Sequence, residues 1–330
     1  MSRQASRQTN GQATGQTIGQ ANEPTDRLIG RQQVTTEPGH FTPKSSGTFV
    51  SFDGTEIYYE TRGEGEPLIF VYGIACLMNH FHHQIDYFSK RNQVITFDLR
   101  GHNRSSAPKN LQHMTVRAMA EDLLALIEHL NVGRAHFVGH SFGVPVLIQY
   151  SKLTRRHNRS FVFINGFARN PIQGMFGLDL VDSFFKFGKK TFRNYPRLVS
   201  HLWKSAVQNP LAGVVAGLVG GFNLVQTEWK DIEIYARAVA EMPLDTFIPL
   251  FEDMMRFNDE DAVKKITTPT LVLAGDNDLV TPLHFQEDLH KMIPGSKFVV
   301  VPRGSHCTQL DFPGLVNFHI EQHIDHLDFT

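Results

Sequence analysis

Residues 137–143 read FVGHSFG, an apolar strand that runs into a Gly-x-Ser-x-Gly pattern and then into a helical pattern. This order predicts a sharp strand-to-helix turn that projects the Oγ atom of Ser141 away from the backbone. Such a turn is so crowded that the positions two residues before and after the serine must lack a side chain, as Gly139 and Gly143 do. The stretch therefore predicts a nucleophile elbow that presents Ser141 on an α/β scaffold.

Short apolar runs recur on both sides of this turn. Residues 48–52 and 56–60 read as a hairpin around Asp53-Gly54, and residues 117–130 carry apolar side chains at helical spacing. The other apolar runs lack alternation, which suits strands that are buried on both faces of a sheet. They are residues 67–72, 94–97, 135–138, 161–164, 270–274 and 297–301. Strands separated by helical segments predict a mostly parallel central sheet flanked by helices.

Composition narrows the possible partners. The chain has 330 residues, of which 41% are hydrophobic, so it can bury a substantial core. Its formal net charge is −1. Proteins that bind nucleic acid usually carry an excess of positive charge, so we expect no nucleic-acid partner. The two cysteines, Cys76 and Cys307, cannot make a disulfide framework, and we expect both to be free thiols.

The first 40 residues differ from the rest of the chain. They are rich in Gln, Thr, Ser and Gly, they repeat Gly-Gln at residues 11, 15 and 19, and the first aromatic residue is Phe41. We expect residues 1–40 to form a disordered tail, because this composition buries too little apolar area to offset the entropy of ordering. No apolar core of a secretory signal peptide is present, and we expect a cytoplasmic protein, with an organelle transit peptide as the alternative.

The strand pattern stops between Phe167 and Asn258, where the composition becomes helical and aromatic. We interpret residues 168–258 as a helical cap inserted into a core formed by residues 41–167 and 259–330. Apolar cap side chains favour an apolar acyl or aryl substrate. The uncharged run at residues 211–222 is too short to span a bilayer, so any membrane contact is peripheral and through the cap.

Further elements at the ends of strands resemble the α/β-hydrolase superfamily, over roughly residues 47–326, with serine esterases and lipases closest in type. In that family a catalytic acid follows a strand in a Gly-x-x-Asp pattern, which Gly275 and Asp278 match, with Asp276 as the competing carboxylate. The family's histidine follows the last strand, as His306 does. The resemblance implies a catalytic triad of Ser141, Asp278 and His306 in that chain order.

The resemblance also implies an oxyanion hole made of backbone N–H groups. One donor is Phe142, directly after the nucleophile, and the other is Ile74 in the loop that follows an early strand. This loop reads Tyr-Gly-Ile where the family usually has His-Gly-x, so Tyr72 stands in place of a histidine. We assign Tyr72, Gly73 and His140 as substrate-binding residues. A second family loop, residues 98–105, carries Asn103 where glycine is usual, and we interpret it as scaffold.

The run His80-Phe81-His82-His83 is the one histidine cluster that suggests metal ligation. No cysteine or carboxylate accompanies it at ligand spacing, so the sequence predicts no metal site there. A serine triad requires no metal, and we expect no cofactor.

The predicted function is a serine hydrolase of small carboxylic esters with apolar acyl or alcohol groups, which acts through an acyl-enzyme and uses water as second substrate. The alternatives are a carbon–carbon bond hydrolase or a lactonase on the same triad, and a noncatalytic binding or receptor protein that retains the pocket.

Overall fold

The computed structural model describes residues 44–172, 181–218 and 221–328. Within these ranges eight strands form one sheet in the order β1-β2-β4-β3-β5-β6-β7-β8. The strands are β1 Ser45–Val50, β2 Glu56–Arg62, β3 Glu66–Val71, β4 Asn92–Phe97, β5 Ala135–His140, β6 Asn158–Ile164, β7 Thr270–Gly275 and β8 Lys297–Val301. Strand β2 pairs antiparallel with both β1 and β4, and every other pairing in the sheet is parallel.

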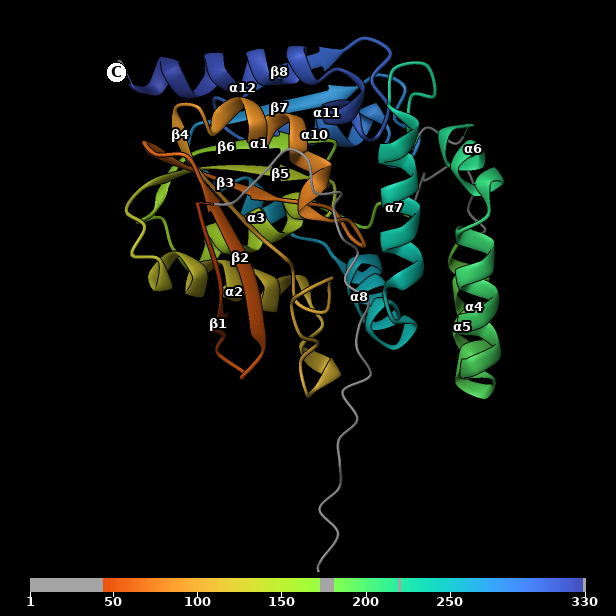
Figure 1. Ribbon diagram of the computed structural model, residues 1–330. Helices are drawn as coiled ribbons and strands as arrows, with labels where there is room; N and C mark the ends of the chain where they lie inside the picture. The colour runs from red at the N-terminus through yellow and green to blue at the C-terminus, as the bar shows by residue number, and fades with distance from the viewer. Residues whose placement is uncertain (1–43, 173–180, 219–220, 329–330) are drawn as a thin grey trace, which may run out of the picture. The chain divides into compact units, whose positions relative to one another are not determined.

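Helices cover both faces of this sheet (Figure 1). On one side α1 contacts α12, and on the other α2 contacts α3, which also packs on β5. The elements of the core are η1 Met78–Phe81, α1 His82–Phe88, η2 Leu111–His113, α2 Val116–His129, α3 Gly143–Leu153, α9 Glu260–Val263, α10 Leu283–Met292, α11 Thr308–Asp311 and α12 Pro313–Asp328. The predicted fold class, a mostly parallel sheet flanked by helices, is confirmed.

Local sequence explains why these elements form. Strands β5 and β7 are buried along their whole length, as their unbroken apolar runs require between two helix layers. The hairpin predicted around Gly54 is β1 and β2, and Gly54 has the positive φ of +84° that such a turn favours. Helix α2 begins after Thr115, whose hydroxyl accepts a hydrogen bond from the Ala118 N–H and caps the first turn.

The turn between β5 and α3 is as crowded as the sequence predicts. Ser141 has φ of +53°, which few residues with a Cβ atom adopt. A Cβ atom on Gly143 would overlap the carbonyl oxygen of Val71 at the end of β3. A Cβ atom on Gly139 would lie 2.8 Å from Leu147 Cδ1. Gly143 therefore lets the elbow lie directly against β3, and Gly139 lets the end of β5 lie against α3.

Between β6 and α9, within the segment predicted to be a cap, the described residues form five helices. They are α4 Val181–Asn194, α5 Pro196–Val207, α6 Pro210–Leu218, α7 Trp229–Glu241 and α8 Leu244–Arg256. Helix α5 contacts α4, α6 and α7, while α8 contacts α2 and η2 of the core. The division of the chain into cap and core remains our interpretation, and the tail predicted at residues 1–40 lies outside the described residues.

Aromatic side chains of these helices pack on one another. The rings of Phe185 and Phe251 are 4.7 Å apart, those of Phe247 and Phe251 are 5.4 Å apart, and Trp203 lies 6.0 Å from Phe247. Much of the aromatic content of this segment therefore fills the space between its own helices. Across the described residues, no helix combines the length and the apolar character needed to cross a membrane.

We predict that Gly143→Ala lowers the free energy of unfolding by about 3 kcal/mol, because the added methyl group must displace the β3 backbone. Gly133→Ala is the matched control, since a Cβ atom there meets nothing within 4 Å, and it should change stability by less than about 0.5 kcal/mol. Urea unfolding of both variants, followed by circular dichroism, measures the difference. Equal midpoints would contradict the role given to the close approach at Val71.

Candidate active site

Three loops at the carboxyl ends of parallel strands bring a serine, a histidine and an aspartate together. Ser141 follows β5, Asp278 follows β7 and His306 follows β8. The His306 Nε2 atom lies 2.8 Å from Ser141 Oγ, and His306 Nδ1 lies 2.9 Å from Asp278 Oδ2. All three side chains are buried. This is the geometry in which an imidazole can accept the serine proton while the carboxylate fixes its tautomer.

Asp278, and not Asp276, occupies the position beside the histidine. The N–H groups of Val280 and Thr281 donate to Asp278 Oδ1 at 2.8 and 2.9 Å, so Oδ2 is left to face His306. Asp276 instead accepts a hydrogen bond from the backbone N–H of Arg303. The structure thus places the two competing carboxylates in different roles, with Asp276 bracing the start of the loop that follows β8.

Asn165, at the end of β6, was missed by the sequence analysis. Its Nδ2 atom donates to the carbonyl oxygens of Ser305 and His306 at 2.9 and 2.8 Å, and its Oδ1 atom accepts from the Gly275 N–H at 2.8 Å. Its own carbonyl lies 2.9 Å from the Thr281 hydroxyl. One side chain therefore joins the loop that carries His306 to the strand that precedes Asp278. The one sequence signal was a polar residue directly after a buried strand.

The backbone around Ser141 offers two N–H groups for an oxyanion. Among the residues that the structure describes, none accepts a hydrogen bond from the N–H of Ile74 or of Phe142. The loop that carries Ile74 lies against the elbow, since a Cβ atom on Gly73 would be 3.1 Å from Ser141 Cβ. Gly73 is therefore a steric requirement of the site. Both N–H groups remain available to bind negative charge that develops beside Ser141.

The side chain of Tyr72 braces this loop. Its hydroxyl donates to Asp98 Oδ1 at 3.2 Å and accepts from the Leu99 N–H at 2.8 Å, and the residue is buried. A second brace is His102, whose Nε2 accepts from the Ala75 N–H at 3.0 Å while its Nδ1 donates to the Arg100 carbonyl at 3.0 Å. The hydroxyl of Tyr72 is thus held at the end of β4, and the assignment of Tyr72 to substrate binding stays a prediction.

His140 lies behind the catalytic histidine. Its Nε2 atom donates to the His306 carbonyl at 2.8 Å, and the two rings are 5.0 Å apart. Burial lowers the pKa of His140 well below its ordinary value, so the ring stays neutral. This contact ties the His140 ring to the backbone of His306, and the assignment of His140 to substrate binding stays a prediction.

Two further groups lie close to the site. Cys76 and Cys307 are free, buried thiols whose pKa values burial raises, so both stay protonated and unreactive at neutral pH.

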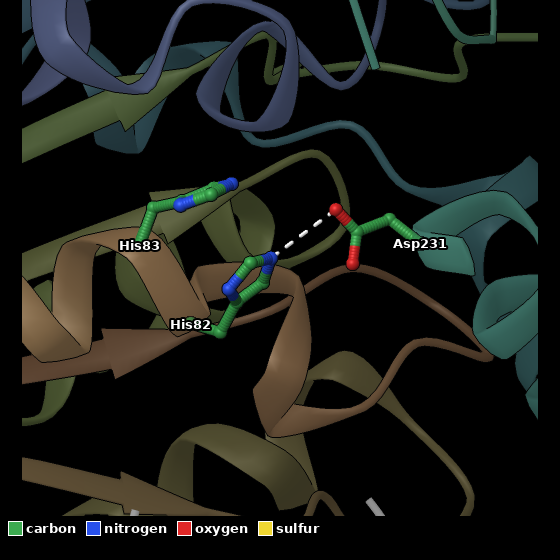
Figure 2. Close-up of side chains that lie close together, drawn as sticks. All are labelled: His82, His83 and Asp231. Atoms are coloured by element: carbon green, nitrogen blue, oxygen red, sulfur yellow. Dashed lines mark hydrogen bonds and ion pairs between the residues drawn. The ribbon is translucent and has the colours of Figure 1, made fainter. Parts of the chain in front are cut away.

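The histidines at the start of α1 lie beside a carboxylate that their spacing along the chain does not reveal. Figure 2 shows Asp231 of α7 facing His82 and His83 of α1, so this cluster can hold a metal ion, contrary to the expectation from spacing.

The family model described as "Alpha/beta hydrolase family" matches residues 72–317, a span that includes the elbow and both partner loops. The chain belongs to the α/β-hydrolase family. Membership agrees with the order of the strands and supports hydrolase chemistry as its coarse function.

Individual relatives are distant. A carbamate hydrolase named RutD from Azorhizobium caulinodans is 24% identical over 269 residues, which cover 79% of this chain and 92% of the relative. A solved structure described as Est816, an N-acyl homoserine lactone degrading enzyme, is 25% identical with a TM-score of 0.64, covering 84% of this chain and 99% of its own. An esterase from Exiguobacterium antarcticum, 20% identical, has a TM-score of 0.70 over 84% of this chain and 98% of its own, and shares the fold.

We predict that Asp278→Asn slows the labelling of Ser141 by a fluorophosphonate probe by about a thousandfold or more, because the amide favours the wrong tautomer of His306. Asp276→Asn should change the rate less than about threefold, since it alters a contact with the Arg303 backbone and not with the imidazole. Labelling rates followed by intact-protein mass spectrometry compare the two variants. Similar losses in both would contradict the assignment of Asp278.

The buried side chain of His102 should make the free energy of unfolding depend on pH. Burial lowers its pKa to about 4 from an ordinary value of 6.5, so between these values the unfolded chain binds a proton that the folded chain does not. This contribution to stability is present above pH 6.5 and is lost as the pH falls toward 4, by up to about 1.4 kcal/mol per pH unit. We expect His102→Gln to flatten the fall in unfolding free energy over this range, as measured by urea unfolding at each pH.

The matched control for this prediction is His201→Gln, on the exposed surface of α5. It should keep the slope of the wild-type chain. A slope that His102→Gln leaves unchanged would show that His102 does not stay neutral in the fold.

Proposed function

We propose that this chain is a serine hydrolase that cleaves carboxylic esters with apolar acyl or alcohol groups through an acyl-enzyme. The observation that carries the proposal is the continuous set of hydrogen bonds from Ser141 through His306 to Asp278, beside two unpaired backbone N–H groups. Nucleophile, base and oxyanion donors are the parts that acyl transfer requires.

The proposed first half-reaction forms an ester with the serine. Ser141 Oγ attacks the substrate carbonyl carbon while its proton passes to His306 Nε2, and Asp278 stabilises the imidazolium that results. The carbonyl π electrons move to the oxygen, where the N–H groups of Ile74 and Phe142 would hold the negative charge. When the intermediate collapses, the bond to the alcohol oxygen breaks and His306 returns the proton to that oxygen.

The second half-reaction uses water in the same way. His306 takes a proton from the water as its oxygen attacks the acyl carbon, and the bond to Ser141 Oγ breaks as the proton returns to the serine. Asn165 and His140 hold the carbonyl of His306 throughout, so the ring keeps its place between Ser141 and Asp278 in both steps. No further reactant is required.

Apolar side chains near His306 support the apolar class of substrate. Phe222 and Ile232 form a buried cluster with Cys307 and Leu310, and the Tyr235 ring packs against it. Cys307 is the residue directly after the catalytic histidine. A substrate carbonyl at Ser141 would therefore have apolar side chains from the inserted helices close to its substituents.

A lactonase is the second candidate. The specific observation that favours it is the 25% identity with Est816, a lactone-degrading enzyme, over most of both chains. A lactone is a cyclic ester, so the same attack by Ser141 opens it and the alcohol stays attached to the acyl group.

We expect turnover of p-nitrophenyl esters that depends on acyl length, with longer apolar chains preferred up to the limit of the pocket. Initial rates with a graded series of these esters, beside N-acyl homoserine lactones of matched chain length, measure both candidates. A higher kcat/KM for esters supports the esterase, and a higher value for lactones supports the second candidate.

The control compares two serines of the same strand-to-helix unit. Ser141→Ala should abolish turnover and probe labelling, whereas Ser151→Ala, within α3 and bonded to the Ile148 carbonyl, should leave both near wild type. Folded wild-type protein that reacts with neither ester, lactone nor fluorophosphonate would contradict both candidates and favour a noncatalytic binding protein.

A further inference from the structure

Two consecutive histidines of the core meet a carboxylate of the inserted helices outside the triad. His82 and His83 begin α1, and Asp231 lies in the first turn of α7, 149 positions after His82. Figure 2 shows both imidazole rings on the side of α1 that faces Asp231. The rings are 3.8 Å apart, and His82 Nε2 lies 3.2 Å from Asp231 Oδ2.

The spacing of these groups suits one small cation. One ligand atom from each of the three residues lies within 4.8 Å of the other two. Two ligands of a tetrahedral zinc ion, each about 2.0–2.1 Å from the metal, are about 3.3 Å apart. The His82–Asp231 pair already has about this separation, and a ligand nitrogen of His83 lies within 4.8 Å of both partners.

The Asp231 carboxylate gives a second observation, independent of the spacing, that favours a cation at this position. Asp231 is 3% exposed, and its Oδ1 atom is buried without a hydrogen-bond partner among the described residues. A buried oxygen that has no partner is unfavourable, and more so when it is charged. The Asp231 carboxylate therefore keeps one buried oxygen to which a cation can bind.

We propose that His82, His83 and Asp231 bind a divalent transition-metal ion of the zinc class, and that this ion fastens α7 to α1. Two imidazoles and one carboxylate suit Zn²⁺ or Co²⁺, whereas Mg²⁺ and Ca²⁺ prefer oxygen ligands alone. The His82 side chain is 19% exposed, which leaves room for water as a fourth ligand and a path for the ion to enter. The inference is independent of the reaction proposed above.

An ion bound at this site would also affect the residues near the triad, through a side chain of α7. Tyr235 lies four residues after Asp231, on the same face of the helix. Its ring packs edge-on against His80 at 5.1 Å and against Phe222 at 5.4 Å, and the His80 ring stacks 6.5 Å from His140. Fixing the first turn of α7 on α1 therefore fixes Tyr235 above the residues that hold His306.

Titration of the full-length, untagged and chelator-treated protein with Co²⁺, followed by visible absorption and by calorimetry, tests the site. We expect one ion per chain, displaced by Zn²⁺ and not by Mg²⁺ or Ca²⁺. His83→Gln and Asp231→Asn should each weaken binding at least about tenfold, while His201→Gln should bind as the wild-type chain does. His83 is only partly buried, so its variant remains informative if Asp231→Asn fails to fold.

Hydrogen exchange of α7 tests the fastening itself. Saturating Zn²⁺ should slow amide exchange in Trp229–Glu241 in the wild-type chain and leave it unchanged in His83→Gln. Absence of Co²⁺ binding, or binding that both ligand variants retain, would overturn the site and leave a simple His82–Asp231 ion pair. Stoichiometric binding without slower exchange in α7 would overturn the fastening.

Discussion

The site depends on the crowding where the turn after β5 meets the end of β3. Ser141 holds a left-handed backbone conformation, which is unfavourable by about 1–3 kcal/mol for a residue with a Cβ atom. Its N–H donates to the Ile164 carbonyl at 2.9 Å, and Gly143 lies against Val71. Together these two contacts fix the position of the turn. Because the sheet imposes this conformation, the Oγ atom of Ser141 is already oriented before a substrate binds.

Parallel strands place the remaining groups beside that serine. The loops after β5, β7 and β8 all leave the same edge of the sheet, so residues far apart in the chain converge there. Asn165, after β6, ties the loops of the histidine and the aspartate together with three hydrogen bonds. A displacement of either loop would break a buried hydrogen bond, and this keeps the imidazole in hydrogen-bond range of both its partners.

Sequence was sufficient for the features that local chemistry determines. The elbow and the buried strands follow from short patterns, and the family resemblance of the loops around Asp278 and His306 implied their order after Ser141. Features that depend on tertiary contacts have no such pattern in the sequence. The Tyr72 hydroxyl could be placed only once the end of β4 was seen beside it. The partner of His82 lies on another helix, at a separation that no spacing rule covers.

The triad and the inserted helices are held by different kinds of contact in this chain. Ser141 and Asp278 follow strands that are buried along their whole length, whereas α7, α8 and the segment between α6 and α7 also meet the core through three carboxylates. Asp231 meets His82, Asp253 accepts from the Val116 N–H at 2.8 Å, and Asp311 accepts from both the Thr227 hydroxyl and the Ser305 N–H. Polar contacts of this kind open at lower free energy than a buried sheet does. The contacts between the inserted helices and the core therefore open more readily than the sheet that keeps Ser141, His306 and Asp278 in place.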